Sequence, residues 1–174
     1  MAKVVLRKRS EIPSEYKWCL EDMFSSDEAW EQEYELVLQK AEAMKAFCGT
    51  LARSGEQLLR FWEADDDLHY YVNRVVVYSN ERYHEDTAVA KYQDYAAKAD
   101  HAVTAASEAE AFAQPEILAI PDGILEEMYV REPGLERYRR AMDEIRRARE
   151  HTLSEAEERN RIGTLDTRRI SPHQ

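Results

Sequence analysis

The chain has 174 residues, which suits one domain or one lobe of a larger protein. Apolar residues make up 44% of it, and only five Gly and five Pro are present, a composition that favours a packed helical fold. The formal net charge of −11 argues against nucleic acid as a partner, because binding to the phosphate backbone needs clustered Lys and Arg. No apolar run is long enough for a signal peptide or a membrane span, so we expect a cytoplasmic chain with no membrane partner.

Residues 1–24 are predicted to be extended and irregular, since Pro13 disfavours helix for the residue before it. Apolar side chains alternate with polar ones in the second half of this segment. They are Tyr16, Trp18, Leu20 and Phe24. Such a segment commonly lies across helices, so we expect an N-terminal strap that buries its aromatic side chains against a helical body.

Capping boxes mark the start of two helices. In each box a Ser side chain and a Glu or Gln three residues later bond each other's free backbone N–H. Ser25 with Glu28 is expected to open the first helix, and Ser54 with Gln57 the second. Apolar residues follow both at steps of three and four, as on one face of a helix. The acidic triplet at 65–67 either interrupts the second helix or caps a new one.

The longest expected helix is capped by Asp86 or Thr87 and runs to about Gln114, where Pro115 ends it. Its inner face consists mainly of small residues, which suit close packing at the centre of a bundle. That face is Val89, Tyr92, Ala96, Ala99, Val103 and Ala106. The remaining expected elements are a linker turn at 117–120 and helices that open at Pro121 and Pro133.

A last capping box, Ser154 with Glu157, announces a helix that the following sequence does not supply, because apolar periodicity is lost after Glu158. We expect residues 159–174 to be a divergent, disordered tail on a helical lobe formed by residues 25–158. The predicted fold class is therefore all-α, an antiparallel multi-helix bundle with an extended N-terminal strap.

His84–Glu85 approaches the zinc-peptidase motif HExxH, in which two histidines four residues apart bind one zinc and the Glu activates the bound water. The second histidine is replaced here by Ala88. Asp86 is also an expected helix cap, which places His84 at a junction rather than within a helix. We interpret His84 as a surface residue at a turn.

Asp66–His69 and Glu81–His84 resemble the carboxylate-x-x-His pairs of di-iron bundles. On one continuous helix the two pairs would lie about 22 Å apart, too far to share a metal pair. The five glycines are isolated, so there is no phosphate-binding loop, and nothing marks one Ser as a nucleophile. We therefore assign no catalytic, cofactor-binding or metal-binding residue.

The cysteines and tyrosines are interpreted as structural. Cys19 and Cys48 fit no disulfide, metal or redox pattern and are expected to be free thiols, with Cys48 a small core residue. The Tyr-rich stretch from Tyr70 to Tyr95 either lines a groove for extended peptides or, as we favour, packs in the core and at its rim.

Several short motifs occur in order along residues 9–158. They are Arg9–x–Glu11–Ile12–Pro13–x–x–Tyr16–Lys17–Trp18, Leu20–Glu21–Asp22–Met23–Phe24, Trp30, Phe47–x–Gly49–x–Leu51, Asp86–Thr87, Pro115–Glu116–Ile117–Leu118 and His151–x–Leu153–Ser154–x–x–Glu157–Glu158. Their order and spacing resemble the N-terminal part of the oligoendopeptidase F family. Two departures are Cys19, where the family commonly has Asp, and the residues from Asn160 onward.

The resemblance implies the N-terminal helical lobe of a zinc metallopeptidase that hydrolyses oligopeptides in a channel between two helical lobes. The family's HExxH helix lies in a C-terminal lobe that this sequence does not match, so no site residue carries over. The lobe is expected to be inactive alone and to hold no cofactor, whereas zinc is expected in the full-length enzyme. Its expected partners are oligopeptide substrate, through the full-length enzyme, and either the missing catalytic lobe or a second copy of itself.

The residues also leave an alternative open, which is a stand-alone acidic helical module that binds a peptide or protein partner. Whether the chain acts as an enzyme is therefore not decided by its sequence.

Overall fold

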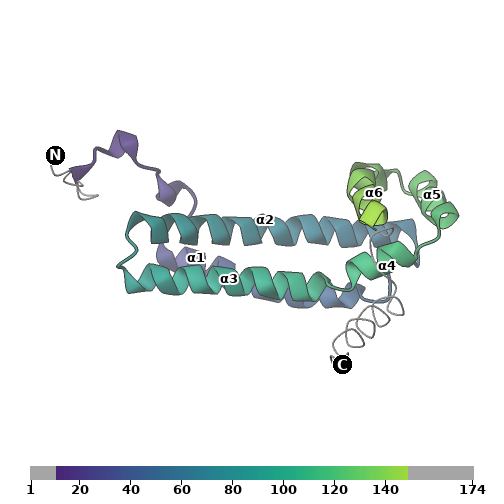
Figure 1. Cartoon of the computed structure of the whole chain (residues 1–174), viewed down its shortest axis with the longest axis horizontal. Helices are drawn as coiled ribbons and strands as arrows, with labels where there is room; N and C mark the ends of the chain where they lie inside the picture. The colour runs from purple at the N-terminus through teal and green to yellow at the C-terminus, as the bar shows by residue number, and fades with distance from the viewer. Residues whose placement is uncertain (1–10, 149–174) are drawn as a thin grey trace, which may run out of the picture.

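The computed structural model describes residues 11–148, and these form an all-α fold (Figure 1). Three long helices pack against one another as an elongated bundle, and shorter helices gather at one end of it. The long helices are α1 (Asp27–Met44), α2 (Gly55–Glu85) and α3 (Ala90–Glu110). The shorter ones are α4 (Ala113–Ala119), α5 (Asp122–Arg131), the 3-10 helix η5 (Pro133–Tyr138) and α6 (Arg139–Ala148). The described residues contain no strand, and the predicted all-α bundle is confirmed.

Both helices predicted from capping boxes are present, but the first predicted cap lies one residue before the actual one. Ser26, not Ser25, caps α1, because its hydroxyl oxygen accepts the backbone N–H of Ala29 at 3.2 Å. Two adjacent serines offer the same chemistry, so spacing alone could not choose between them. The second box is as predicted, with the Ser54 hydroxyl accepting the N–H of Gln57 at 3.1 Å.

Helix α2 runs unbroken through the acidic triplet at 65–67. It has 31 residues against 21 in α3, so the prediction that the longest helix ends near Gln114 is wrong. The triplet is tolerated because its exposed members find cationic partners on other elements. Asp66 pairs with Arg137 at 3.1 Å, and Asp67 pairs with Lys40.

The end of α3 also differs from the prediction. It stops at Glu110, and Pro115 lies inside α4, so most of the expected linker turn at 117–120 is helical. Pro115 is the third residue of α4, and first-turn residues need no partner for their N–H within the helix. The buried face is shifted as well, because Val103 is 42% exposed. The face that packs inward is Tyr95, Ala99, Ala102, Ala106 and Ala109.

Trp30, near the start of α1, is buried between the three long helices and contacts the other two. It is fully buried, its indole N–H donates to the Val75 carbonyl at 3.0 Å, and its ring stacks on Tyr95 with centroids 4.0 Å apart. Buried aromatic pairs of this kind add stability beyond their area. This core makes α1–α3 one packed body.

The strap follows the prediction in only part of its length. It contains short 3-10 turns at Ser14–Tyr16 and Leu20–Asp22. Leu20 and Phe24 are buried, but Tyr16 and Trp18 are 75% and 81% exposed. The expectation that all its aromatic side chains are buried is therefore wrong.

The predictions for residues 1–10, for the helix at Ser154 and for the tail at 159–174 lie outside the described residues. Among the helices that the structure does describe, none combines the length and apolarity that crossing a membrane would require.

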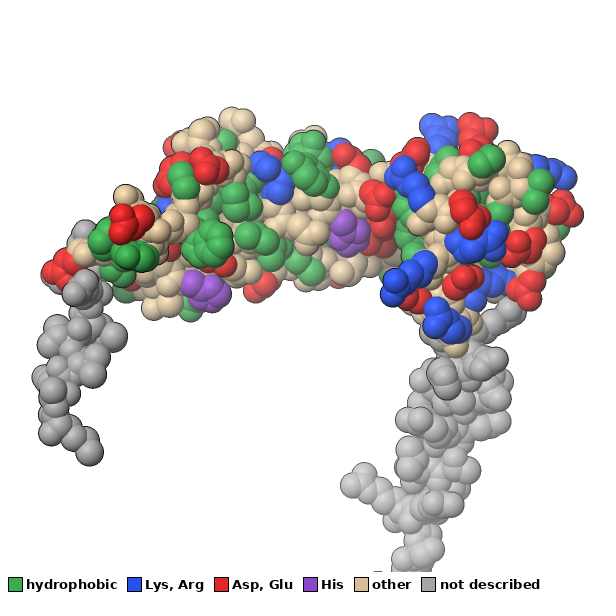
Figure 2. All heavy atoms as spheres, turned by 90° about the horizontal axis from the view of Figure 1, so that it is seen from above, with side chains coloured by type: hydrophobic (Ala, Val, Ile, Leu, Met, Phe, Trp, Pro, Cys, Tyr) green, Lys and Arg blue, Asp and Glu red, His purple; other side chains and the backbone are tan. Residues whose placement is uncertain are grey.

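Figure 2 shows how side chains of different kinds are distributed over one face of the molecule. Charged side chains crowd the end formed by α5 and α6. Along the rest of the bundle, hydrophobic side chains are visible among the charged ones.

Candidate functional site

The histidine of the incomplete zinc motif does not lie in a metal site. His84 is exposed near the C-terminal end of α2. The neighbouring Glu85 accepts a hydrogen bond from Arg82 at 3.1 Å. Across residues 11–148, the one group of three ligand-type side chains close enough to share an ion lies elsewhere and excludes His84. His84 therefore has no partner side chains here with which to hold the zinc expected of the full-length family enzyme, among the residues that the structure describes.

Both cysteines are free thiols on the surface of the described part of the chain. Cys48 is exposed, so its assignment to the core is wrong. The reason is that α1 ends at Met44, so Cys48 does not continue its apolar face. Cys48 lies instead in a turn before Gly49, which has a positive φ of 74°. Cys19 is exposed in the strap, and a hydrogen bond with Asp22 is the main cause that raises the pKa of its thiol. A raised pKa leaves less of the reactive thiolate at neutral pH.

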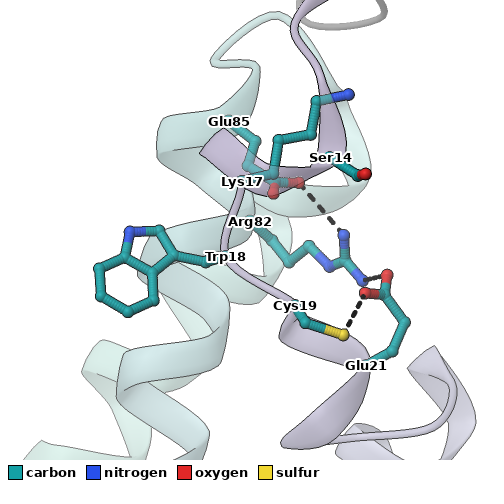
Figure 3. A pocket seen from close by; sticks show the side chains of 7 residues that line it. All are labelled: Ser14, Lys17, Trp18, Cys19, Glu21, Arg82 and Glu85. Carbon is teal, nitrogen blue, oxygen red and sulfur yellow. Dashed lines mark hydrogen bonds and ion pairs between the residues drawn. The ribbon is translucent and has the colours of Figure 1, made fainter.

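A hollow of about 310 Å³ lies between the strap and the last turns of α2 (Figure 3). It is lined by Ser14, Lys17, Trp18, Cys19, Glu21, Arg82 and Glu85. The Arg82 guanidinium donates to Glu21 at 2.7 Å and to Glu85 at 3.1 Å, and it lies 5.1 Å from the centroid of the Tyr78 ring. Because Arg82 is already matched by two carboxylates, we interpret it as the anchor of the strap rather than as a ligand-binding group.

The tyrosine-rich stretch divides between core and surface. Tyr78 and Tyr95 are each only 1% exposed, which agrees with the favoured interpretation as core packing, whereas Tyr70 is 57% exposed. Tyr70 packs edge-on against Tyr71 with centroids 5.1 Å apart. The stretch therefore does not form one continuous exposed stripe.

A cluster of three ionisable side chains lies between α2 and the end of α3. Asp65 and His69 are four residues apart on α2 and so share one face of that helix. Glu110, the last residue of α3, reaches them from the neighbouring helix. Nε2 of His69 lies 3.0 Å from Oε2 of Glu110 and 3.9 Å from Oδ1 of Asp65.

Burial gives this cluster unusual electrostatics. The side chains of Asp65 and Glu110 are 19% and 15% exposed, against 46% for His69. Burial first, and then the charge of Glu110, raise the pKa of Asp65 to about 6. The hydrogen bond to Glu110 raises the pKa of His69. The second oxygen of Glu110, Oε1, is buried and accepts no hydrogen bond within the described part of the chain.

The sequence paired His69 with the wrong carboxylate. Asp66 points instead towards η5, where it accepts hydrogen bonds from Tyr138 at 2.6 Å and Arg137 at 3.1 Å. The spacing of four between Asp65 and His69 was a readable signal that we missed. No sequence signal could have linked Glu110 to the cluster, because only the packing of α3 on α2 brings it to His69.

Comparisons with known proteins give one consistent result. The family model described as oligopeptidase F matches residues 116–159. Oligopeptidase PepF of Bacillus subtilis is 35% identical over 153 residues, which are 88% of this chain and 23% of that protein. Group B oligopeptidase PepB of Streptococcus agalactiae is 34% identical over 150 residues, 86% of this chain and 25% of that protein.

A solved structure agrees. The crystal structure of oligoendopeptidase-F from Enterococcus faecium superposes with a TM-score of 0.66 at 28% identity, covering 74% of this chain and 26% of that one. The chain thus spans about a quarter of the length of the relatives that it matches.

Proposed function

Because this chain belongs to the oligoendopeptidase F family, as a segment matching about a quarter of its relatives' length, we propose that it is the N-terminal helical lobe of an oligopeptide-hydrolysing metallopeptidase. The observation that carries the proposal is the 35% identity to Oligopeptidase PepF, which extends over 88% of the chain. In this role the lobe performs no chemistry, and it is inactive without the catalytic lobe.

A rigid body is what such a role requires. A lobe that lines a substrate channel and limits which peptides reach the reaction centre must keep its structure when a peptide binds. The buried contacts of Trp30 with Val75 and Tyr95 tie α1, α2 and α3 together and supply that rigidity. Substrate chemistry and zinc are then contributed by the catalytic lobe.

A chimera tests the proposal directly. Residues 11–148 replace the matching segment of the Bacillus subtilis relative, and hydrolysis of a quenched fluorescent oligopeptide is measured. We expect the folded chimera to hydrolyse the peptide and a chelator to stop the reaction. The isolated chain, supplied with zinc, is expected to give no turnover.

Two results would contradict the proposal. One is zinc-dependent turnover by the isolated chain that disappears in His84→Gln, which would make His84 catalytic. The other is a soluble, helical chimera that cleaves no peptide. If the isolated chain also bound an extended or basic peptide tightly, a separate interaction module would be the better description.

A further inference from the structure

We propose that Asp65, His69 and Glu110 form a binding site for a divalent transition-metal ion of the zinc class. The site goes beyond the proposed function, because it lies between two helices of the lobe itself and is distinct from the zinc expected in the catalytic lobe. Its three ligand atoms lie within 4.8 Å of one another.

The donor set fits this class of metal. One imidazole nitrogen and two carboxylate oxygens are ligands that Zn²⁺ accepts, at distances of about 2.0–2.2 Å. Two atoms bound to the same ion can then be separated by at most about 4.4 Å. Nε2 of His69 already meets that limit with both carboxylates, at 3.0 and 3.9 Å. The three ligand atoms lie within 4.8 Å of one another, so the two carboxylate oxygens need to approach each other by at most a few tenths of an ångström.

The charge balance also calls for a cation. Within residues 11–148, His69 is the only basic side chain that forms an ion pair with Asp65 or Glu110. Two largely buried carboxylates therefore share at most one positive charge. Buried charges are ordinarily paired or coordinate a metal. The ion would supply the second charge.

A buried atom of the cluster points to the same conclusion independently. Oε1 of Glu110 accepts no hydrogen bond from any of residues 11–148, although a buried carboxylate oxygen left without a donor costs free energy. A metal held in bidentate fashion by Glu110, or a water bound to that metal, would give this oxygen its missing partner.

Access and ligand number set the chemical class. The side chain of His69 is 46% exposed, so an ion can enter from solvent and keep a water as a further ligand. Mg²⁺ and Ca²⁺ prefer six or more oxygen ligands, and the imidazole therefore disfavours them. Binding also requires the neutral imidazole, so Nε2 gives up the proton that it shares with Glu110 and releases it to solvent.

The consequence for the fold is a cross-link. Asp65 and His69 belong to the middle of α2, whereas Glu110 ends α3 just before the turn into α4. An ion bound by all three residues would clamp the end of α3 to α2, at the junction of the bundle with the shorter helices.

Calorimetric titration of the full chain with ZnCl₂ tests the proposal, with MgCl₂ as comparison. We expect one Zn²⁺ per chain, a higher melting temperature with Zn²⁺, and no effect of Mg²⁺. His69→Gln and Glu110→Gln should each weaken zinc binding by more than about tenfold. Loss of a residue that only hydrogen-bonds a metal ligand already weakens metal binding by about tenfold or more, and loss of a direct ligand should cost more. His84→Gln and Asp66→Asn are the matched controls and should bind as the unchanged chain does.

Each other outcome overturns the site. Unaltered binding in both His69→Gln and Glu110→Gln, or no binding by the unchanged chain, shows that the cluster takes no metal. Equal weakening by His84→Gln and His69→Gln shows non-specific binding by surface histidines only. Since Glu110→Gln keeps the size of the side chain, it remains informative if His69→Gln alters the fold, which circular dichroism would report.

Discussion

Single arginine side chains hold the shorter elements in place. Arg146 of α6 reaches back to the end of α4, where its guanidinium donates to the carbonyl of Ile117 at 3.3 Å and twice to that of Ile120, at 3.0 and 3.1 Å. The last carbonyls of a helix have no partner within it. Arg146, 15% exposed, therefore both caps α4 and fixes α6 against it.

We predict that Arg146→Met lowers the free energy of unfolding by about 2–3 kcal/mol. The variant loses hydrogen bonds from a charged donor, and the carbonyls of Ile117 and Ile120 lose the guanidinium as a partner. Urea denaturation followed by circular dichroism measures this change. Arg147→Met is the matched control, since Arg147 is exposed and its hydrogen bond among residues 11–148 goes to the Asp143 carbonyl of its own helix, at 3.4 Å. Similar losses in the two variants would refute the capping role.

At the scale of elements, the contact of α2 with α5 depends on a residue without a side chain. A Cβ atom added to Gly55, the first residue of α2, would lie 3.0 Å from the Met128 carbonyl oxygen and 3.0 Å from Cβ of Glu132. Both atoms belong to backbone or to the root of a side chain, so neither can rotate away. A Cβ added to Gly123, in the first turn of α5, would meet no described atom within 4 Å.

Gly55→Ala should therefore destabilise the fold by about 1–3 kcal/mol, as overpacking commonly does. Gly123→Ala should be neutral or stabilising by up to about 1 kcal/mol, because Gly loses more backbone freedom on folding. Thermal denaturation of the two variants beside the unchanged chain checks both signs. Equal melting temperatures for the two would mean that α5 shifts freely on α2.

The elements were predictable from sequence where local chemistry decides, and not where packing decides. The Ser54 cap is local, and it was correct. The continuity of α2 through residues 65–67 depends on Lys40 and Arg137, which come from other elements. The cluster at His69 was out of reach for the same reason, because Glu110 arrives only when α3 packs on α2.

On the scale of the whole molecule, buried tyrosines link stability to alkaline pH in both parts of the fold. Tyr78 and Tyr95 lie in the bundle, and Tyr129 and Tyr138 lie in the shorter elements at its end. Burial is the main cause that raises the pKa of each, to about 12 for Tyr129 and Tyr138. In the unfolded chain a tyrosine ionises near its usual pKa of about 10.

The sign of the effect follows from these values. Below about pH 10 the phenols are protonated in both states, so their contribution is fully present. As pH rises from there towards 12, the unfolded chain loses protons that the folded chain keeps, and stability falls. Urea denaturation at a series of pH values should show this loss, with tyrosinate absorbance rising as the chain unfolds. Tyr129→Phe combined with Tyr138→Phe should make the loss shallower, because a phenylalanine has no proton to release; an unchanged slope would mean that other groups, such as lysines, cause the alkaline unfolding.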